Sequence, residues 1–269
     1  MIRRRPVALV AAAMAGLLVA CQAAPPPTAL TDPREILAAA ATTTAAAHSV
    51  RIDVTADGTL SLDLLGLGAP SPVELTGTTV SADLDIDGGD GRATFSAPGL
   101  LGLTGEVIAL DGTGYYKTTL TGQLYHQQRL GAEVPAASGA ARASILKGLT
   151  DLLSNPTLKP VKAEDAECGG TTCYRVEIAL TSADLAALGA GDLQAPTGLP
   201  VPIPIPDLAA ATLDLQVLVA KDSTRLMGTN AALDLGGGAG VATVSLTFSK
   251  WDEAVSIAAP PPDQVTPAN

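Results

Sequence analysis

Aromatic residues, basic residues and histidines are all scarce in this sequence. Its 269 residues include one tryptophan, four tyrosines and two phenylalanines, which argues against base-stacking platforms and carbohydrate-stacking clefts. Sixteen basic residues face 27 acidic ones, giving a net charge of −11, so a nucleic-acid surface is not expected. Two histidines, His48 and His126, and three cysteines leave most metal-hydrolase and histidine-based catalytic schemes short of residues. We therefore expect no enzyme, no cofactor and no metal site.

Apolar residues make up 47% of the chain, enough for a real core, and the first twenty resemble an export signal. Arg3 to Arg5 form a charged start, and Val7 to Ala20 form an apolar run that is too short to span a bilayer comfortably. The run ends Leu-Val-Ala-Cys, which resembles the bacterial lipobox and predicts a lipidated Cys21. An ordinary signal peptide with a chance cysteine is the alternative. Two or more acyl chains would anchor the chain stably to a membrane, on its extracytoplasmic face.

Proline-rich segments flank the expected folded domain. Residues 21–31 predict the lipidated cysteine followed by a stiff, extended tether, with a reach of about 30 Å in a polyproline conformation. Residues 32–258 predict the folded domain, and residues 259–269 predict a frayed, disordered tail.

Two cysteines remain if Cys21 carries lipid. Cys168 and Cys173 are separated by Gly-Gly-Thr-Thr, a hairpin-turn composition, and a disulfide across it suits an oxidising exterior. A metal site is the alternative, but it would need two further ligands.

The periodicity predicts mostly sheet with a few helices. Asp32-Pro33-Arg34-Glu35 begins a helix that runs to about His48, after which alternating apolar residues predict a meander of strands through residue 120. Asp57-Gly58 reads as a turn within it. Leucines at helical spacing predict a helix within 140–154, and Ser182 is expected to cap a short second helix. Strands are expected at about 157–166, 173–181, 211–220, 225–235 and 241–249, with a loop over 189–207.

The order of these features resembles the LppX/LprAFG lipoproteins of actinobacterial cell envelopes. The resemblance rests on the lipobox, the helix-then-meander order, Asp111-Gly112-x-x-Tyr115-Tyr116-Lys117, the leucine-rich helix, Tyr174-Arg175-Val176-Glu177 and the closing run from Leu246 to Ile257. It covers roughly residues 30–260. The long proline-rich loop and the disulfide depart from the pattern.

This resemblance implies an α+β fold, in which a strongly curved antiparallel sheet (a half-barrel, LolA-like) carries a few helices over its concave face. It also implies an apolar cavity that binds an acylated lipid or lipoglycan, which the protein carries or presents at the cell surface, with a membrane transporter as the source of the lipid. A monomer is expected.

Aliphatic side chains of the meander and of the covering helix are the expected cavity lining: Leu100, Leu101, Leu103, Val107, Ile108, Leu110, Ile145, Leu146, Leu149, Leu152 and Leu153. The alternative is that these residues pack against one another, as in a structural or interaction lipoprotein with a filled core. A third hypothesis, an envelope hydrolase, would depend on His126 as its base.

Two other motifs fail on inspection. The segment from Asp83 to Gly88 begins like a calcium loop, but Thr94 stands where a bidentate glutamate belongs, so its acids are read as a solvated strand face. The glycines at 236–240 lack the ending of a phosphate loop and are read as a hairpin.

Overall fold

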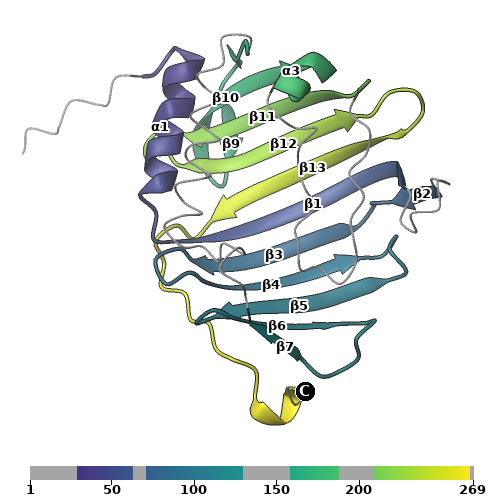
Figure 1. The fold of residues 1–269 in the computed structure, drawn as a ribbon. Helices are drawn as coiled ribbons and strands as arrows, with labels where there is room; N and C mark the ends of the chain where they lie inside the picture. Colours follow the sequence, from purple (N-terminus) through teal and green to yellow (C-terminus); the bar gives the residue numbers. More distant parts are fainter. Residues whose placement is uncertain (1–28, 63–70, 130–157, 188–208, 267–269) are drawn as a thin grey trace, which may run out of the picture.

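The computed structural model describes residues 29–62, 71–129, 158–187 and 209–266, and these form one open antiparallel sheet with helices on one side (Figure 1). The helices are α1 (Pro33–Ala45), α3 (Ser182–Ala187) and the short 3₁₀ helix η2 (Pro262–Gln264). The strands are β1 (Ser49–Leu62), β2 (Ser71–Glu74), β3 (Thr78–Asp85), β4 (Asp90–Ala97), β5 (Leu103–Leu110), β6 (Thr113–Thr118), β7 (His126–Arg129), β8 (Val161–Lys162), β9 (Ala166–Cys168), β10 (Thr171–Leu180), β11 (Thr212–Ala220), β12 (Leu226–Asp234) and β13 (Gly240–Ser249).

The strand order places β1, the first strand of the domain, beside β13, the last strand. It runs β7-β6-β5-β4-β3-β1-β13-β12-β11-β10-β8, with β2 paired to β1 and β9 paired to β10. Each half is a meander of sequence neighbours, and β1 joins the halves by pairing with both β3 and β13. The predicted fold class, a curved half-barrel sheet with helices over it, is confirmed.

Helix α1 begins where the sequence predicts. The side chain of Asp32 accepts a hydrogen bond from the Arg34 N–H at 2.7 Å, and Pro33 occupies the first turn, where its missing N–H costs nothing. The helix ends at Ala45, three residues before the predicted end. None of the described helices is long and apolar enough to cross a membrane.

The cap of α3 is Thr181, one residue before the predicted Ser182. The Thr181 hydroxyl accepts from the Asp184 N–H, and the Asp184 carboxylate accepts from the backbone N–H and hydroxyl of Thr181. This reciprocal arrangement is a capping box, with aspartate in the place of the usual glutamate.

The predicted turn at Asp57-Gly58 is wrong, because both residues lie inside the continuous strand β1. Gly58 has φ +115°, and a Cβ there would lie 2.3 Å from the Val241 carbonyl oxygen on β13. Glycine is required at this position by the close approach of two strands and not by a reversal of the chain.

The C-terminal residues also differ from the expected frayed tail. The Tyr125 N–H donates to the Gln264 carbonyl, and the Thr266 N–H donates to the Tyr125 carbonyl, both at 2.8 Å. Residues 259–266 are thus held beside the β6–β7 connection by a parallel bridge between Tyr125 and Val265. Figure 1 shows this segment running from β13 to the β7 edge of the sheet.

Candidate functional site

The sheet has a mainly apolar face and a mainly polar face, because side chains alternate along its strands and opposite residues lie in register, except at a β-bulge between Leu218 and Val219 of β11. We call the face on which α1 and α3 pack the inner face. Directly opposite residues of neighbouring strands share a face, so one row of it runs Ile52, Ala82, Ala93, Val107 and Tyr116 across β1, β3, β4, β5 and β6.

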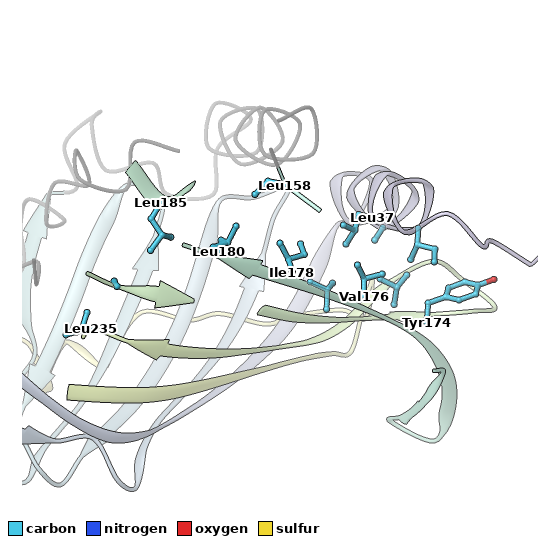
Figure 2. Packing of buried hydrophobic residues seen from close by; sticks show 13 residues of the cluster. Leu37, Leu158, Tyr174, Val176, Ile178, Leu180, Leu185 and Leu235 are labelled. Carbon is cyan, nitrogen blue, oxygen red and sulfur yellow. The ribbon is translucent and has the colours of Figure 1, made fainter. Parts of the chain in front are cut away.

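The part of the inner face over β10–β12 is a filled core. Ile36 and Leu37 of α1, Leu185 of α3 and Leu158 are all buried with large side chains of β10 and β11. Figure 2 shows Leu37 and Leu158 facing Val176 and Ile178. These strands carry only large aliphatic or aromatic side chains at the inner positions: Tyr174, Val176, Ile178, Leu180, Leu213, Leu215, Val217 and Val219.

The part over β1, β3, β4, β5 and β6 is different, and we call it the acyl-chain floor after the ligand that we propose for it. Small residues hold many of its inner positions, namely Ala82, Gly91, Ala93, Gly105, Ala109 and Gly114. The larger side chains of the floor keep part of their surface accessible: Ile52, Val54, Val80, Leu84, Phe95, Leu103 and Tyr116 are half-buried, and Val107 is 40% exposed.

Two large side chains of the floor lie flat on neighbouring glycines. A Cβ on Gly105 would lie 2.4 Å from Cζ of Phe95, and a Cβ on Gly91 would lie 2.9 Å from Cδ2 of Leu84. Because glycine has no side chain, the ring of Phe95 and the end of the Leu84 side chain occupy the space above these glycines and lie close to the backbone of the sheet. The result is a broad, shallow apolar surface of Leu, Val, Phe, Ala and Gly.

The structure does not bring the predicted lining residues of the meander to one surface. Leu103 and Val107 lie on the acyl-chain floor, whereas Ile108 and Leu110 point to the opposite face of β5. Leu100 and Leu101 lie in the β4–β5 turn, and Leu101 is 93% exposed. The predicted lining helix with Ile145, Leu146, Leu149, Leu152 and Leu153 lies outside the described residues, as do Cys21, the signal segment and the loop 189–207.

The opposite face, which we call the outer face, carries ion pairs as well as buried apolar side chains such as Ile108. On β1 and β3, Arg51 lies 3.2 Å from carboxylate oxygens of both Asp53 and Asp83. The Ser81 hydroxyl donates to Asp53 at 2.6 Å, and this hydrogen bond holds the pKa of Asp53 below its usual value. Asp83 is therefore an outer-face ion-pair partner, in agreement with the strand-face interpretation of the Asp83–Gly88 motif.

A second outer-face group centres on Glu106, which is 8% exposed. Its carboxylate accepts hydrogen bonds from Arg92 Nε and the Tyr125 hydroxyl, each at 2.6 Å, and lies 3.6 Å from Lys117 Nζ. Burial raises the pKa of Glu106, but the hydrogen bonds and the two cations outweigh it and hold that pKa below its usual value. This group positions Tyr125, and Tyr125 in turn pairs with the C-terminal segment.

Two hollows of about 370 and 330 Å³ lie on the outer face near the β12–β13 turn. Their linings include the side chains of Asp57, Asp214, Asp234, Thr59 and Thr243. A hydrocarbon chain bound there would lie against carboxylates and would desolvate them, which is unfavourable.

His126, the most available base for the hydrolase hypothesis, lies on the inner face at β7. Its ring stacks on Tyr116 with centroids 5.4 Å apart, and Nε2 lies 3.3 Å from the Thr121 carbonyl oxygen. These contacts describe an aromatic pair at the sheet edge.

Cys168 and Cys173 form the predicted disulfide, with Cα atoms 6.0 Å apart across the β9–β10 hairpin. Gly169 and Gly170 make the two-residue turn, with φ values of +56° and +85°. Within the described ranges, no group of three or more His, Cys, Asp or Glu side chains is arranged to hold a metal ion.

Comparison with solved structures matches this architecture. The crystal structure of LprF from Mycobacterium bovis superposes with a TM-score of 0.51 at 18% identity, over 86% of this chain and 98% of LprF. The chain has the fold of LprF. The Mycobacterium tuberculosis lipoprotein LppX aligns with a TM-score of 0.49 at 17% identity, over 84% of this chain and 98% of LppX. No family model and no curated protein sequence matches the chain. The resemblance read from the sequence is thus confirmed at the level of the LprF fold.

The acyl-chain floor is the feature that sequence reasoning missed. Its small residues alternate with outer-face residues along their strands, two apart as with Gly91 and Ala93, or four apart as with Gly105 and Ala109, which have Val107 between them. That pattern is visible in the sequence, but hydrophobicity ranks alanine and glycine below leucine and so does not single them out.

Proposed function

We propose that this protein is a non-enzymatic cell-envelope lipoprotein, anchored through Cys21, that holds the acyl chains of a lipid or lipoglycan on the acyl-chain floor and carries or presents that lipid. The observation that carries the proposal is the floor itself, an apolar surface that stays partly accessible next to a well-packed core. The LprF fold and the sequence resemblance to envelope lipoproteins agree with it.

The energetics require such a surface. Moving hydrocarbon through water costs about 0.8 kcal/mol per CH₂, so two sixteen-carbon chains cost on the order of 20–25 kcal/mol. Only continuous apolar contact offsets a cost of that size. Branched aliphatic side chains around a base of alanine and glycine can contact a flexible acyl chain along its length. Such contacts do not select one lipid headgroup.

The location follows from the same elements. A lipidated Cys21 with a tether of about 30 Å would keep the domain close to a membrane on its extracytoplasmic face. The disulfide agrees with that compartment, because cytosolic thiols are kept reduced. A membrane transporter that supplies the lipid belongs to this proposal as a partner.

Adjacent residues on opposite faces provide a matched test. Ala93 lies on the floor, and Thr94 is an exposed residue of the outer face. Ala93→Phe fills the floor between Ala82 and Val107, whereas Thr94→Phe adds the same ring to the polar side.

The measurement has two steps. The purified full chain is extracted with organic solvent and its lipids are counted by mass spectrometry, and the delipidated chain is then titrated with pyrene-labelled phosphatidylcholine. We expect the parent and Thr94→Phe to carry and bind lipid equally. We expect Ala93→Phe to lose affinity at least about tenfold, because a tenfold change corresponds to about 1.4 kcal/mol, which is roughly the contact of two CH₂ groups. Equal binding by all three chains would place the ligand elsewhere. A parent that neither carries nor binds lipid would instead support the structural lipoprotein with a filled core.

A further inference from the structure

Three exposed leucines gather at one end of the sheet, in two neighbouring turns. Leu101, in the β4–β5 turn, is 93% exposed, and Leu120 and Leu124, in the β6–β7 connection, are 63% and 44% exposed. The turns are adjacent because Gly105 pairs with Thr118, and the Thr119 N–H donates to the Thr104 carbonyl at 2.9 Å. We call residues 98–102 and 119–124 the leucine end.

Leu101 is unfavourable in water for two separate reasons. Its apolar side chain is almost fully solvated, and its backbone has φ +55°, a left-handed conformation that non-glycine residues rarely adopt. The neighbouring Gly102, with φ +67°, is the residue type that such a turn favours. A strained, exposed leucine that makes no contribution to the core points to a role outside the folded chain.

Charge is distributed unequally between the two ends of the sheet. Neither turn of the leucine end contains Asp, Glu, Lys or Arg. Most turns at the other end are charged: Asp87 lies between β3 and β4, Asp111 between β5 and β6, Lys221 and Asp222 between β11 and β12, and Lys250, Asp252 and Glu253 follow β13, whereas the β9–β10 turn is Gly169-Gly170. Exposed Glu74 and Asp263 lie beside the leucine end, but its two turns are themselves uncharged, and uncharged turns that carry leucines suit a hydrocarbon environment and not a charged protein partner.

The N-terminus enters the domain at the charged end. The Leu30 N–H donates to the hydroxyl of Tyr174, near the start of β10, at 2.9 Å. Figure 1 shows α1 across that end of the sheet, away from the start of β5 and the end of β6. The first described residues of the chain therefore lie at the end of the sheet opposite the leucine end.

From these observations we propose that the leucine end docks on a phospholipid bilayer, with Leu101, Leu120 and Leu124 entering its hydrocarbon. The interaction is apolar, so it needs no anionic lipid and resists salt. It does not depend on the acyl-chain floor holding a ligand, although a docked end would bring the start of β5, with Leu103 on the floor, close to the bilayer.

A local fluorescence probe tests this docking in the full chain. Leu101→Trp places an indole at the turn, and Ser223→Trp places one in the exposed β11–β12 turn at the charged end. Vesicles of phosphatidylcholine brominated on its acyl chains quench only an indole that reaches the hydrocarbon. Emission of the added indole is taken as the difference from the parent chain, which contains Trp251 in every case.

We expect strong quenching at position 101 and none at position 223, unchanged at 0.5 M NaCl. Adding Leu120→Ser to Leu101→Trp should weaken the affinity of this end for the vesicles about tenfold, and adding Leu124→Ser as well about a hundredfold. Absence of quenching at position 101 overturns the proposal, whether the chain stays free or self-associates through the leucine end. Equal quenching at both positions also overturns it, because the contact would then have no preferred end. Neither result bears on the Ala93→Phe measurement, so the two proposals fail separately.

Discussion

Replacing Glu106 by glutamine removes one charge from the outer-face group that holds the β5–β7 edge and leaves the shape of the side chain almost unchanged. Glu106 is 8% exposed and accepts from Arg92 and Tyr125 at 2.6 Å each. Glutamine can still accept one of these hydrogen bonds through its amide oxygen. The amide nitrogen that replaces the other oxygen cannot accept, so either Arg92 loses its acceptor or the Tyr125 hydroxyl must turn and accept instead, and glutamine offers Lys117 no charge.

The magnitude follows from the exposure of the partners. A hydrogen bond to a charged group contributes about 1.5–3 kcal/mol, which here is weakened because Arg92 is 55% exposed and regains water. We expect Glu106→Gln to lower the free energy of unfolding by about 1–2 kcal/mol at pH 7. Urea unfolding followed by circular dichroism measures it.

The pH dependence provides the sharper test. The pKa of Glu106 is held below its usual value in the folded state, so the unfolded chain binds a proton more readily. The stabilisation is therefore complete above the pKa of an unfolded glutamate, about 4.3, and is lost as the pH falls through the lower folded pKa. The stability difference between parent and Glu106→Gln should be constant from pH 5.5 to 7 and should shrink below about pH 4.3.

Glu177→Gln is the matched control, because Glu177 is an exposed outer-face residue of β10 with one partner, Arg175, at 3.3 Å. It should change stability by less than about 0.5 kcal/mol. A Glu106→Gln effect that is equally small, or that stays the same between pH 3 and 7, would refute the assigned role of the Glu106 charge.

Two further stability predictions concern the backbone. Replacing both Cys168 and Cys173 by alanine opens a six-residue loop and should lower the free energy of unfolding by about 2 kcal/mol, measured against the parent with and without reductant; a parent that is insensitive to reductant would contradict it. Gly58→Ala should destabilise by well over about 1 kcal/mol, since its Cβ would lie 2.3 Å from the Val241 carbonyl, whereas Gly237→Ala, also at positive φ but with open space around it, should lose only about 1 kcal/mol. Thermal unfolding of the two variants separates strand crowding from simple backbone preference, and equal losses would show that crowding at Gly58 is absent.

Local signals predicted most of the fold. The start of α1 at Asp32-Pro33 and the strands β11, β12 and β13 appear close to their predicted bounds, because capping and period-two alternation depend on residues close together in the chain. The wrong turn prediction at Asp57-Gly58 also came from a local signal. Its composition is that of a turn, and only the approach of β13, nearly two hundred residues later, makes glycine necessary within a strand.

The candidate site was harder to predict than the fold. Val107 and Ile108 are both large and apolar, but neighbours in a strand point to opposite faces, so a list of apolar residues cannot be a list of cavity residues. Register decides which alternate set faces the helices. It also decides that Ala82, Ala93 and Val107 lie in one row, which no single strand reveals. The C-terminal segment shows the same limit, because its order depends on Tyr125, a residue far from it in the chain.

The two halves of the sheet differ in how closely their inner surfaces are packed. This difference allows the acyl-chain floor to stay accessible while the other half forms the core. Over β10–β12, large side chains pack against α1 and α3 and form the buried core. Over β1 and β3–β6, the strands are joined by their backbone hydrogen bonds and by outer-face contacts, where Arg51 joins Asp53 to Asp83 and Glu106 joins Arg92 to Tyr125. Because neither set of contacts uses the inner surface of these strands, that surface need not be closely packed for the sheet to persist. A change that fills the floor should therefore alter binding more than stability, and a change to the Glu106 group should do the reverse.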